Sequence, residues 1–261
     1  MKRGFDLWIA LLSALGLFFL TMPVLVLIFS TSPESFFFAI RDREFLGTLK
    51  VSILSATFSS LFVLLLGTPI SYILARKTFP LKGILEHLVD LPIAIPHSVS
   101  GIAILYFFGR TSPVGQMLNI MGIKVYGDMV GIVLAMSFVS APYYIASVKE
   151  GLSVVPREYE SVSYSLGRGR AFTFFRVILP MARSHLFKGL ILSWGRALSE
   201  FGAVMVVAYY PMTATVFIYE RLESLGIKST LPYAVIVLLL SGGLFVTFRV
   251  LWGRYAQNRR S

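Results

Sequence analysis

The chain has 261 residues, of which 56% are hydrophobic and only 14% are charged, and its formal net charge is +11. A soluble domain carries roughly 25% charged residues, so this composition excludes a chain that is surrounded mainly by water. The absence of cysteine excludes disulfides, thiolate metal sites and thiol nucleophiles. A basic excess can attract nucleic acid or anionic lipid, and the positions of the charges decide between these partners.

Six stretches are apolar enough to cross a membrane, which requires about 20 residues. Five are built on runs without Lys, Arg, Asp or Glu, and the sixth contains Arg196 and Glu200. The first run passes through Met22-Pro23 without a small-residue cleavage site, which favours a retained helix over a signal peptide. We therefore predict an all-α polytopic membrane protein, with one transmembrane domain over residues 1–261. The predicted spans cover residues 7–30, 48–75, 90–109, 129–148, 189–209 and 230–250.

The basic residues indicate the orientation, because cytoplasmic loops collect Lys and Arg. With the N-terminus inside, 16 of the 24 basic residues fall in cytoplasmic segments and 7 in external ones, and Arg196 lies within a span. This predicts that both termini are cytoplasmic. It also explains the net charge by anionic lipid at the inner leaflet, so no nucleic-acid partner is expected.

The longest predicted cytoplasmic loop contains a segment, residues 156–180, that favours two short helices at a bend. Pro156 fits a first helical turn, acidic side chains follow it, and Gly167 fits a left-handed helix end. Tyr159, Val162, Ser163 and Leu166 have the spacing of one helix face. A second helix is predicted from Arg170 to Ile178, with Pro180 ending it. Two short helices at a bend would form a projection that fits a groove on another protein. The alternative is an amphipathic loop that lies on the membrane surface.

This segment resembles the "EAA" loop of permeases from ATP-binding-cassette (ABC) importers. Gly167 and Leu179-Pro180 have the family's spacing, Val177 takes the place of Ile, and Ser161-Val-Ser163 stands where the family has Glu-Ala-Ala, with Glu160 one position earlier. The resemblance implies a type I importer permease fold and docking of this loop on a cytoplasmic ABC ATP-binding subunit. The docking residues it implies are Glu158, Tyr159, Glu160, Ser161, Ser165, Gly167, Arg168, Leu179 and Pro180.

A second resemblance lies in the fifth predicted span. The run Trp194-Gly-Arg-Ala-Leu-Ser-Glu-Phe-Gly-Ala203 is similar to permeases for tetrahedral oxyanions, and the continuation from Val206 to Met212 resembles the archaeal molybdate/tungstate type. The proline-rich run Leu91-Pro-Ile-Ala-Ile-Pro-His97 resembles the same group. The resemblance implies molybdate or tungstate as substrate, with sulfate or thiosulfate as the alternative. The candidate gate, pathway or interface residues are Pro96, His97, Ser98, Arg196, Ser199, Glu200, Phe201 and Gly202.

The charged pair in this span has two interpretations. Arg196 and Glu200 are four residues apart and can pair on one helix, either as a fixed link between spans or as a gate that exchanges partners. Gly195 and Gly202 allow close helix approach, at a dimer interface or in ordinary packing. We interpret His97 as a hydrogen-bonded packing residue, with a ligand or proton carrier as the alternative.

The sequence has no phosphate-binding loop of the Gly-x-x-x-x-Gly-Lys-Ser/Thr type, no His-Glu-x-x-His and no Gly-x-Ser-x-Gly. We therefore expect no enzymatic activity, no catalytic residue, no metal and no cofactor in this chain, with ATP bound by a separate subunit. The expected partners are ABC ATP-binding subunits, an extracytoplasmic oxyanion-binding protein, a second copy of the chain and the lipid bilayer. One alternative is an ATP-independent secondary transporter or channel, for which the chain offers only one internal ion pair and one histidine. A second is a membrane scaffold or an intramembrane enzyme, for which the sequence shows no catalytic motif.

Overall fold

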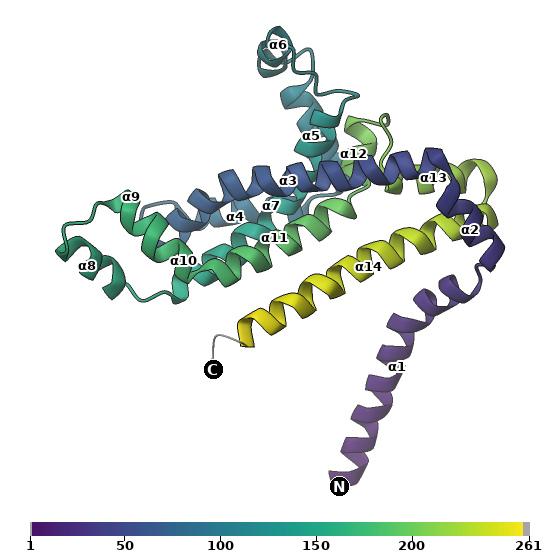
Figure 1. Cartoon of the computed structure of the whole chain (residues 1–261), viewed down its shortest axis with the longest axis horizontal. Helices are drawn as coiled ribbons and strands as arrows, with labels where there is room; N and C mark the ends of the chain where they lie inside the picture. The colour runs from purple at the N-terminus through teal and green to yellow at the C-terminus, as the bar shows by residue number, and fades with distance from the viewer. Residues whose placement is uncertain (1, 258–261) are drawn as a thin grey trace.

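The computed structural model describes residues 2–257, and the regular secondary structure of this part of the chain is entirely helical, without a strand. The helices α3, α7 and α11 form the centre of the molecule, and α14 lies obliquely beside them (Figure 1). The helices α2 and α13 lie together at one end of the molecule, and α8, α9 and α10 lie at the other end (Figure 1). The helices are α1 (Lys2–Phe29), α2 (Pro33–Arg41), α3 (Arg43–Arg76), α4 (Lys82–Ala94), α5 (His97–Phe108), α6 (Pro113–Ile120), α7 (Met129–Val154), α8 (Glu158–Ser165), α9 (Arg170–Thr173), the π-helical turn η1 (Phe174–Ile178), α10 (Leu179–Met181), α11 (Arg183–Leu198), α12 (Gly202–Val207), α13 (Ala214–Leu225) and α14 (Ile227–Gln257).

The centre of the molecule is the packing of α7 against α3 and α11. Small hydroxyl side chains lie at these crossings, where they allow close approach and bond across it. Ser137 Oγ donates to Ser59 Oγ at 3.2 Å, and Ser193 Oγ donates to Ser140 Oγ at 3.1 Å. Tyr144 is fully buried between these helices, and its hydroxyl lies 2.7 Å from Thr68 Oγ1. Hydroxyl pairs therefore satisfy several polar groups inside an otherwise apolar core, whereas the buried hydroxyl of Ser55 on α3 has no partner in the described residues.

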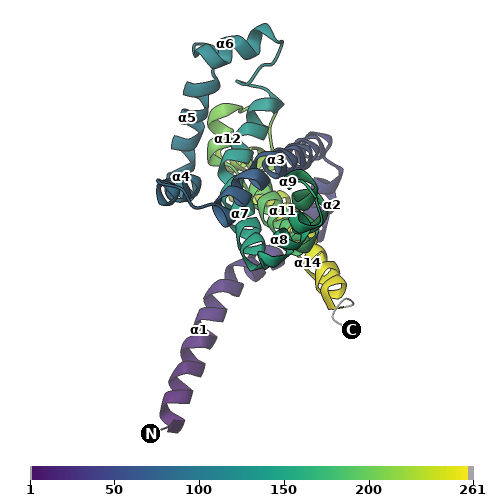
Figure 2. The same ribbon diagram turned by 90° about the vertical axis from the view of Figure 1, so that its left-hand side faces the viewer.

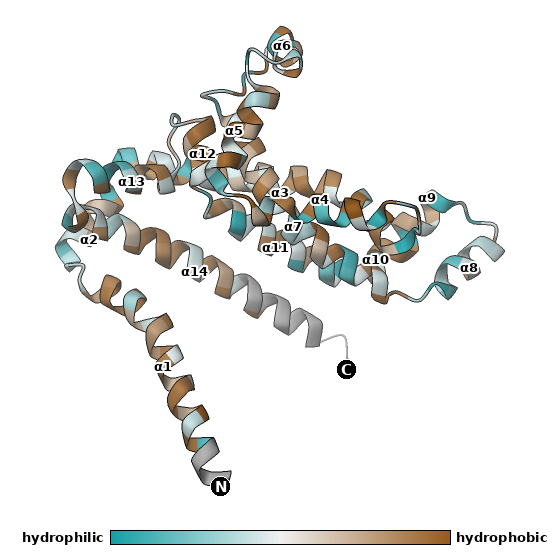
Figure 3. Cartoon of the chain, turned by 180° about the vertical axis from the view of Figure 1, so that it is seen from behind, coloured by the Kyte–Doolittle hydropathy of each residue, from teal (hydrophilic) through white to brown (hydrophobic). Residues whose placement is uncertain are grey.

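Four helices of the described part are long and apolar enough to cross a membrane: α1, α3, α7 and α14. Brown, hydrophobic residues predominate on α1 and α14 (Figure 3). The apolar stretch of α1 has no buried residue within the chain, so lipid or another chain must cover it. Arg259 and Arg260, part of the predicted cytoplasmic C-terminus, lie outside the described residues.

The predicted third span is not one straight helix. Its window begins in α4 and ends in α5, and these two helices meet at an angle of 115°. Pro96 explains the bend, because a proline holds the preceding residue in an extended conformation, and Ile95 has φ −86° and ψ 146°. As a result α5 rises away from the long helices with α12 beside it, and α6 lies at its far end (Figures 1 and 2).

The predicted fifth span is also divided. The helix α11 ends at Leu198, and the short helix α12 begins at Gly202 after three residues outside any helix. Neither piece alone has the length of a membrane span. Two of the six predicted windows are therefore broken helices, and both breaks contain residues that the sequence singles out.

Candidate functional site

The helix α8 ends as the sequence predicts, at a left-handed glycine. Gly167 has φ +73°, its N–H donates to Tyr164 O at 2.9 Å, and Arg168 N–H donates to Ser163 O at 3.1 Å. These bonds satisfy carbonyls that a helix end otherwise leaves free. The helix begins at Glu158, so Pro156 precedes the first turn that we predict it to occupy. Gly167 thus turns the chain sharply toward α9.

The second helix of the loop is longer than predicted, because Pro180 does not end it. The run from α9 through η1 and α10 continues to Met181. In the π-helical turn, Leu179 N–H donates to Phe174 O, five residues back. Such a turn is wider than an α-helical turn, which reduces the clash of the Pro180 ring with the residues before it.

One exposed face of α8 is apolar. Tyr159, Val162 and Leu166 have exposed fractions of 47%, 58% and 74%. Ser163, which we predict on the same face, is instead buried, and its hydroxyl lies 2.8 Å from Thr173 Oγ1 on α9. Ser163 is buried because α9 packs over it. The hydroxyl pair joins the two helices and leaves the apolar face available to a partner.

The predicted docking residues fall into two groups. Most are on the surface: Glu158, Tyr159, Ser161, Ser165, Gly167, Arg168 and Pro180 are exposed, and Leu179 is partly exposed. Glu160 differs, because its side chain is 18% exposed and its Oε1 lies 3.3 Å from Nε of Arg76 at the end of α3. Sequence reasoning missed Arg76, since no local spacing relates it to the loop.

A cluster of three ionisable side chains lies where the two broken helices meet. Nη2 of Arg196 is 2.8 Å from Oε2 of Glu200 and 2.8 Å from Nε2 of His97. Nδ1 of His97 is 3.2 Å from the same Glu200 oxygen. The carboxylate of Glu200 is fully buried, whereas the His97 side chain is 42% exposed. We call Arg196, Glu200 and His97 the ion cluster.

Glu200 links four elements through its carboxylate and its backbone. Oε1 accepts from Ala203 N at 2.9 Å, at the start of α12, and the Glu200 carbonyl accepts from Thr215 Oγ1 of α13 at 2.8 Å. His97, at the start of α5, and Arg196, on α11, complete the link. A buried carboxylate that accepts several bonds in this way holds the break between α11 and α12 in one geometry.

Glycines let α5 cross closely over α12. A Cβ added at Gly202 would lie 2.9 Å from His97 Cβ, and one added at Gly101 would lie 2.8 Å from the carbonyl oxygen of Ala203. No atom lies within 4 Å of the corresponding position at Gly195. Gly202 therefore serves packing within the chain, and Gly195 does not.

The remaining candidate residues lie around the ion cluster. Pro96 precedes α5, Ser98 is exposed on its first turn, and the rings of Phe201 and Tyr219 are 5.0 Å apart. Arg196 and Ser199 face a recess of about 440 Å³ with mostly apolar walls from α7, α11 and α14. The structure thus brings the predicted gate residues together, away from the loop at the end of the molecule (Figure 1).

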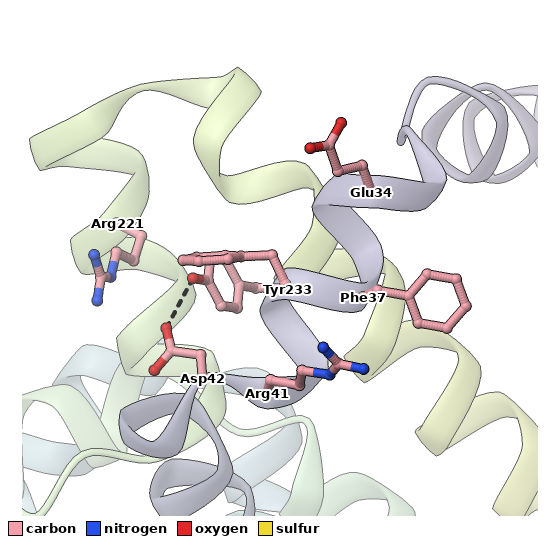
Figure 4. Close-up of a pocket in the computed structure, with 7 residues that line it drawn as sticks. Glu34, Phe37, Arg41, Asp42, Arg221 and Tyr233 are labelled. Carbon is pink, nitrogen blue, oxygen red and sulfur yellow. Dashed lines mark hydrogen bonds between the residues drawn. The ribbon is translucent and has the colours of Figure 1, made fainter.

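A larger recess, of about 870 Å³, opens at the opposite end from α8, between α2, α13 and α14 (Figure 4). Tyr233 Oη donates to Asp42 Oδ2 at 2.8 Å, and Arg221 pairs with Glu44 at 2.8 Å. Asp42 also caps α3 by accepting from Glu44 N at 2.9 Å. These contacts join the start of α3 to α13 and α14. Arg41 and Arg221 line the recess together with Glu34 and Asp42, so its basic and acidic groups balance.

Comparisons with known proteins agree with the architecture. The family described as "Binding-protein-dependent transport system inner membrane component" matches residues 67–259. The molybdate/tungstate transport system permease protein WtpB of Thermococcus kodakarensis is 38% identical, over 97% of this chain and 99% of the relative. A probable sulfate transport system permease protein of Chlorokybus atmophyticus is 32% identical, over 89% and 83%. The crystal structure of a bacterial ABC transporter that imports alginate matches with a TM-score of 0.75 at 16% identity, over 97% and 96%, which confirms the predicted fold.

Proposed function

Because the chain belongs to the family of binding-protein-dependent transport system inner membrane components, we propose that it is the membrane-spanning subunit of an ATP-driven importer for molybdate or tungstate. The observation that carries this proposal is the near full-length identity of 38% to a molybdate/tungstate permease. The left-handed Gly167 and the exposed apolar face of α8 support it, because a loop that docks on an ATP-binding subunit would need a sharp bend and an exposed apolar face.

Sulfate is the second candidate substrate, and the 32% identity to a sulfate permease is the observation that favours it. Molybdate, tungstate and sulfate are all tetrahedral dianions, so the membrane path need not distinguish them. Selectivity then lies with the extracytoplasmic binding protein. Calorimetric titration of that protein with tungstate, molybdate and sulfate decides between the candidates.

The proposed topology has six spans with both termini in the cytoplasm. The four long apolar helices supply four spans, the bent pair α4–α5 a fifth, and the divided pair α11–α12 the sixth. The bias of Lys and Arg supports this orientation, because it places the α8–α10 end in the cytoplasm and the α2–α13 end outside. The chain then lies in the cell membrane as a multi-pass protein.

We propose that the chain dimerises, that two ATP-binding subunits dock on the α8–α10 loops and that an oxyanion-binding protein docks on the outer face. ATP-driven closure of the two ATPases would draw the loops together. This would change the relative populations of the inward-open and outward-open states of the helices. The permease itself performs no covalent chemistry.

For the ion cluster we propose a fixed link rather than a gate. Its support is the full burial of Glu200 and the bonds of Glu200 to two further elements. A gating pair must exchange partners, and each exchange would expose or strand a buried charge. Arg196 and Ser199 remain the candidates to face the translocation path, through the recess beside them.

Co-purification with the ATPase tests the proposed function. Gly167→Val forces a β-branched residue into a left-handed conformation, so we expect the loop to lose its bend and the ATPase to dissociate. Gly169→Val is the matched control, because Gly169 has φ −74° and open space around it. The proposal fails if the wild-type chain never recruits an ATP-binding subunit.

A further inference from the structure

The end of α3 is attached to the docking loop by a buried charge. Arg76 is the last residue of α3 and is 8% exposed. Its Nε lies 3.3 Å from Oε1 of Glu160 on α8. Both atoms are buried, and neither has a hydrogen-bond partner elsewhere in residues 2–257. Each of these charged atoms is therefore compensated by the other.

The same arginine is fixed by the backbone around it. Nη2 of Arg76 donates to Val155 O, at the end of α7, at 2.7 Å. The carbonyl of Arg76 accepts from Nη2 of Arg157, which immediately precedes α8, at 3.4 Å. The guanidinium thus connects the ends of α3 and α7 with the first turn of α8.

A second contact lies one helical turn back along α3. The ring of Tyr72 packs edge-on against the ring of Phe174 in η1, with centroids 4.9 Å apart. Because Ser163 and Thr173 also join α8 to α9, the loop and the end of α3 form one connected unit. Movement of α8 would consequently displace α3, one of the three central helices.

We propose that the Arg76–Glu160 ion pair transmits movement of the docking loop to α3, and that Glu160 is a positioning residue rather than a contact of the ATPase. This inference rests on the proposed function. Glu158, which is exposed two residues earlier on α8, is the acidic residue available to the ATPase. In this proposal Glu158 contacts the ATPase, whereas Glu160 holds α8 to the end of α3.

Neutralising each carboxylate separates the two roles. We expect Glu160→Gln to retain ATPase binding, while stimulation of ATP hydrolysis by substrate-loaded binding protein falls at least about fivefold, the lower end of typical coupling. Glu158→Gln should instead weaken ATPase binding and leave stimulation intact at saturating ATPase. The control Glu150→Gln removes one member of an exposed pair with Lys188 and should change neither quantity.

The charge-swapped variant Arg76→Glu with Glu160→Arg should recover stimulation that each single swap loses. Loss of ATPase binding in Glu160→Gln, with stimulation unaffected at saturating ATPase, would overturn the inference and place Glu160 at the ATPase. Failure of the wild-type chain to bind any ATPase would instead contradict the proposed function, which keeps the two outcomes distinct.

A distance measurement in the assembled complex tests the link without removing it. The chain has no cysteine, so spin labels at Lys77→Cys and Tyr164→Cys, both exposed positions outside the predicted docking residues, report the separation of α3 and α8. We expect that distance to stay constant when ATP binds. A shift or a broadened distribution in the otherwise unmodified chain would show that α8 moves independently of α3 and would overturn the inference.

Discussion

At the residue scale, buried charged side chains hold separate helices of the molecule together. Glu200 is fully buried, and its oxygens are shared among Arg196, His97 and the backbone of Ala203. Removing one partner from a buried pair costs about 3–5 kcal/mol, because it leaves the other charge uncompensated. An exposed pair contributes at most about 1 kcal/mol.

We predict that Glu200→Gln lowers the free energy of unfolding by about 3 kcal/mol, since it leaves Arg196 without its carboxylate. Thermal unfolding in detergent measures the loss, and Glu44→Gln, which breaks the more exposed pair with Arg221, should shift the midpoint far less. Transport per folded molecule should stay unchanged. Unchanged stability with an altered ratio of transport to ATP hydrolysis would indicate a gate instead.

Part of this chemistry could be predicted from the sequence. The Arg196–Glu200 pairing follows from a spacing of four residues, and the left-handed end of α8 follows from Gly167. The Arg76–Glu160 pair could not be predicted, because residues 84 positions apart share no local periodicity. The only signal for Arg76 is a basic residue at the end of a long apolar helix, which is common at membrane surfaces.

At the element scale, apolar windows in the sequence do not predict the breaks within the third and fifth predicted spans. The predicted windows overlap α4–α5 and α11–α12 but cannot show the 115° bend. Pro96 gave a local signal for the first break. The second break depends on contacts of Glu200 with His97 and Thr215. These contacts join residues that are far apart in the sequence, so a single apolar window cannot predict them.

We predict that Gly101→Ala destabilises the crossing of α5 and α12 by about 1–3 kcal/mol, because the new methyl group meets the Ala203 carbonyl at 2.8 Å. Gly195→Ala adds the same group in open space on α11 and should not lower the unfolding midpoint of the monomer in detergent. Equal midpoints for both variants would contradict the packing described here. A loss of dimer confined to Gly195→Ala would place that glycine at a subunit interface.

At the scale of the whole molecule, the chain presents an exposed apolar face at one end and a long apolar helix without a buried residue. The exposed Tyr159, Val162 and Leu166 form an apolar face on α8, and the apolar stretch of α1 has no buried residue. Both features are expected of a subunit that is complete only in an assembly. In the proposed importer, the connected unit of α3 and α8 would carry movement of the ATP-binding subunits to the central helices.

Reconstitution tests the central claim most directly. The chain, its ATP-binding subunit and the oxyanion-binding protein are placed in liposomes, and ATP hydrolysis is measured with and without tungstate. We predict hydrolysis that tungstate-loaded binding protein stimulates, together with tungstate uptake that requires ATP. Tungstate uptake at the same rate without ATP, or a rate of hydrolysis indifferent to the loaded binding protein, would contradict an ATP-driven oxyanion importer.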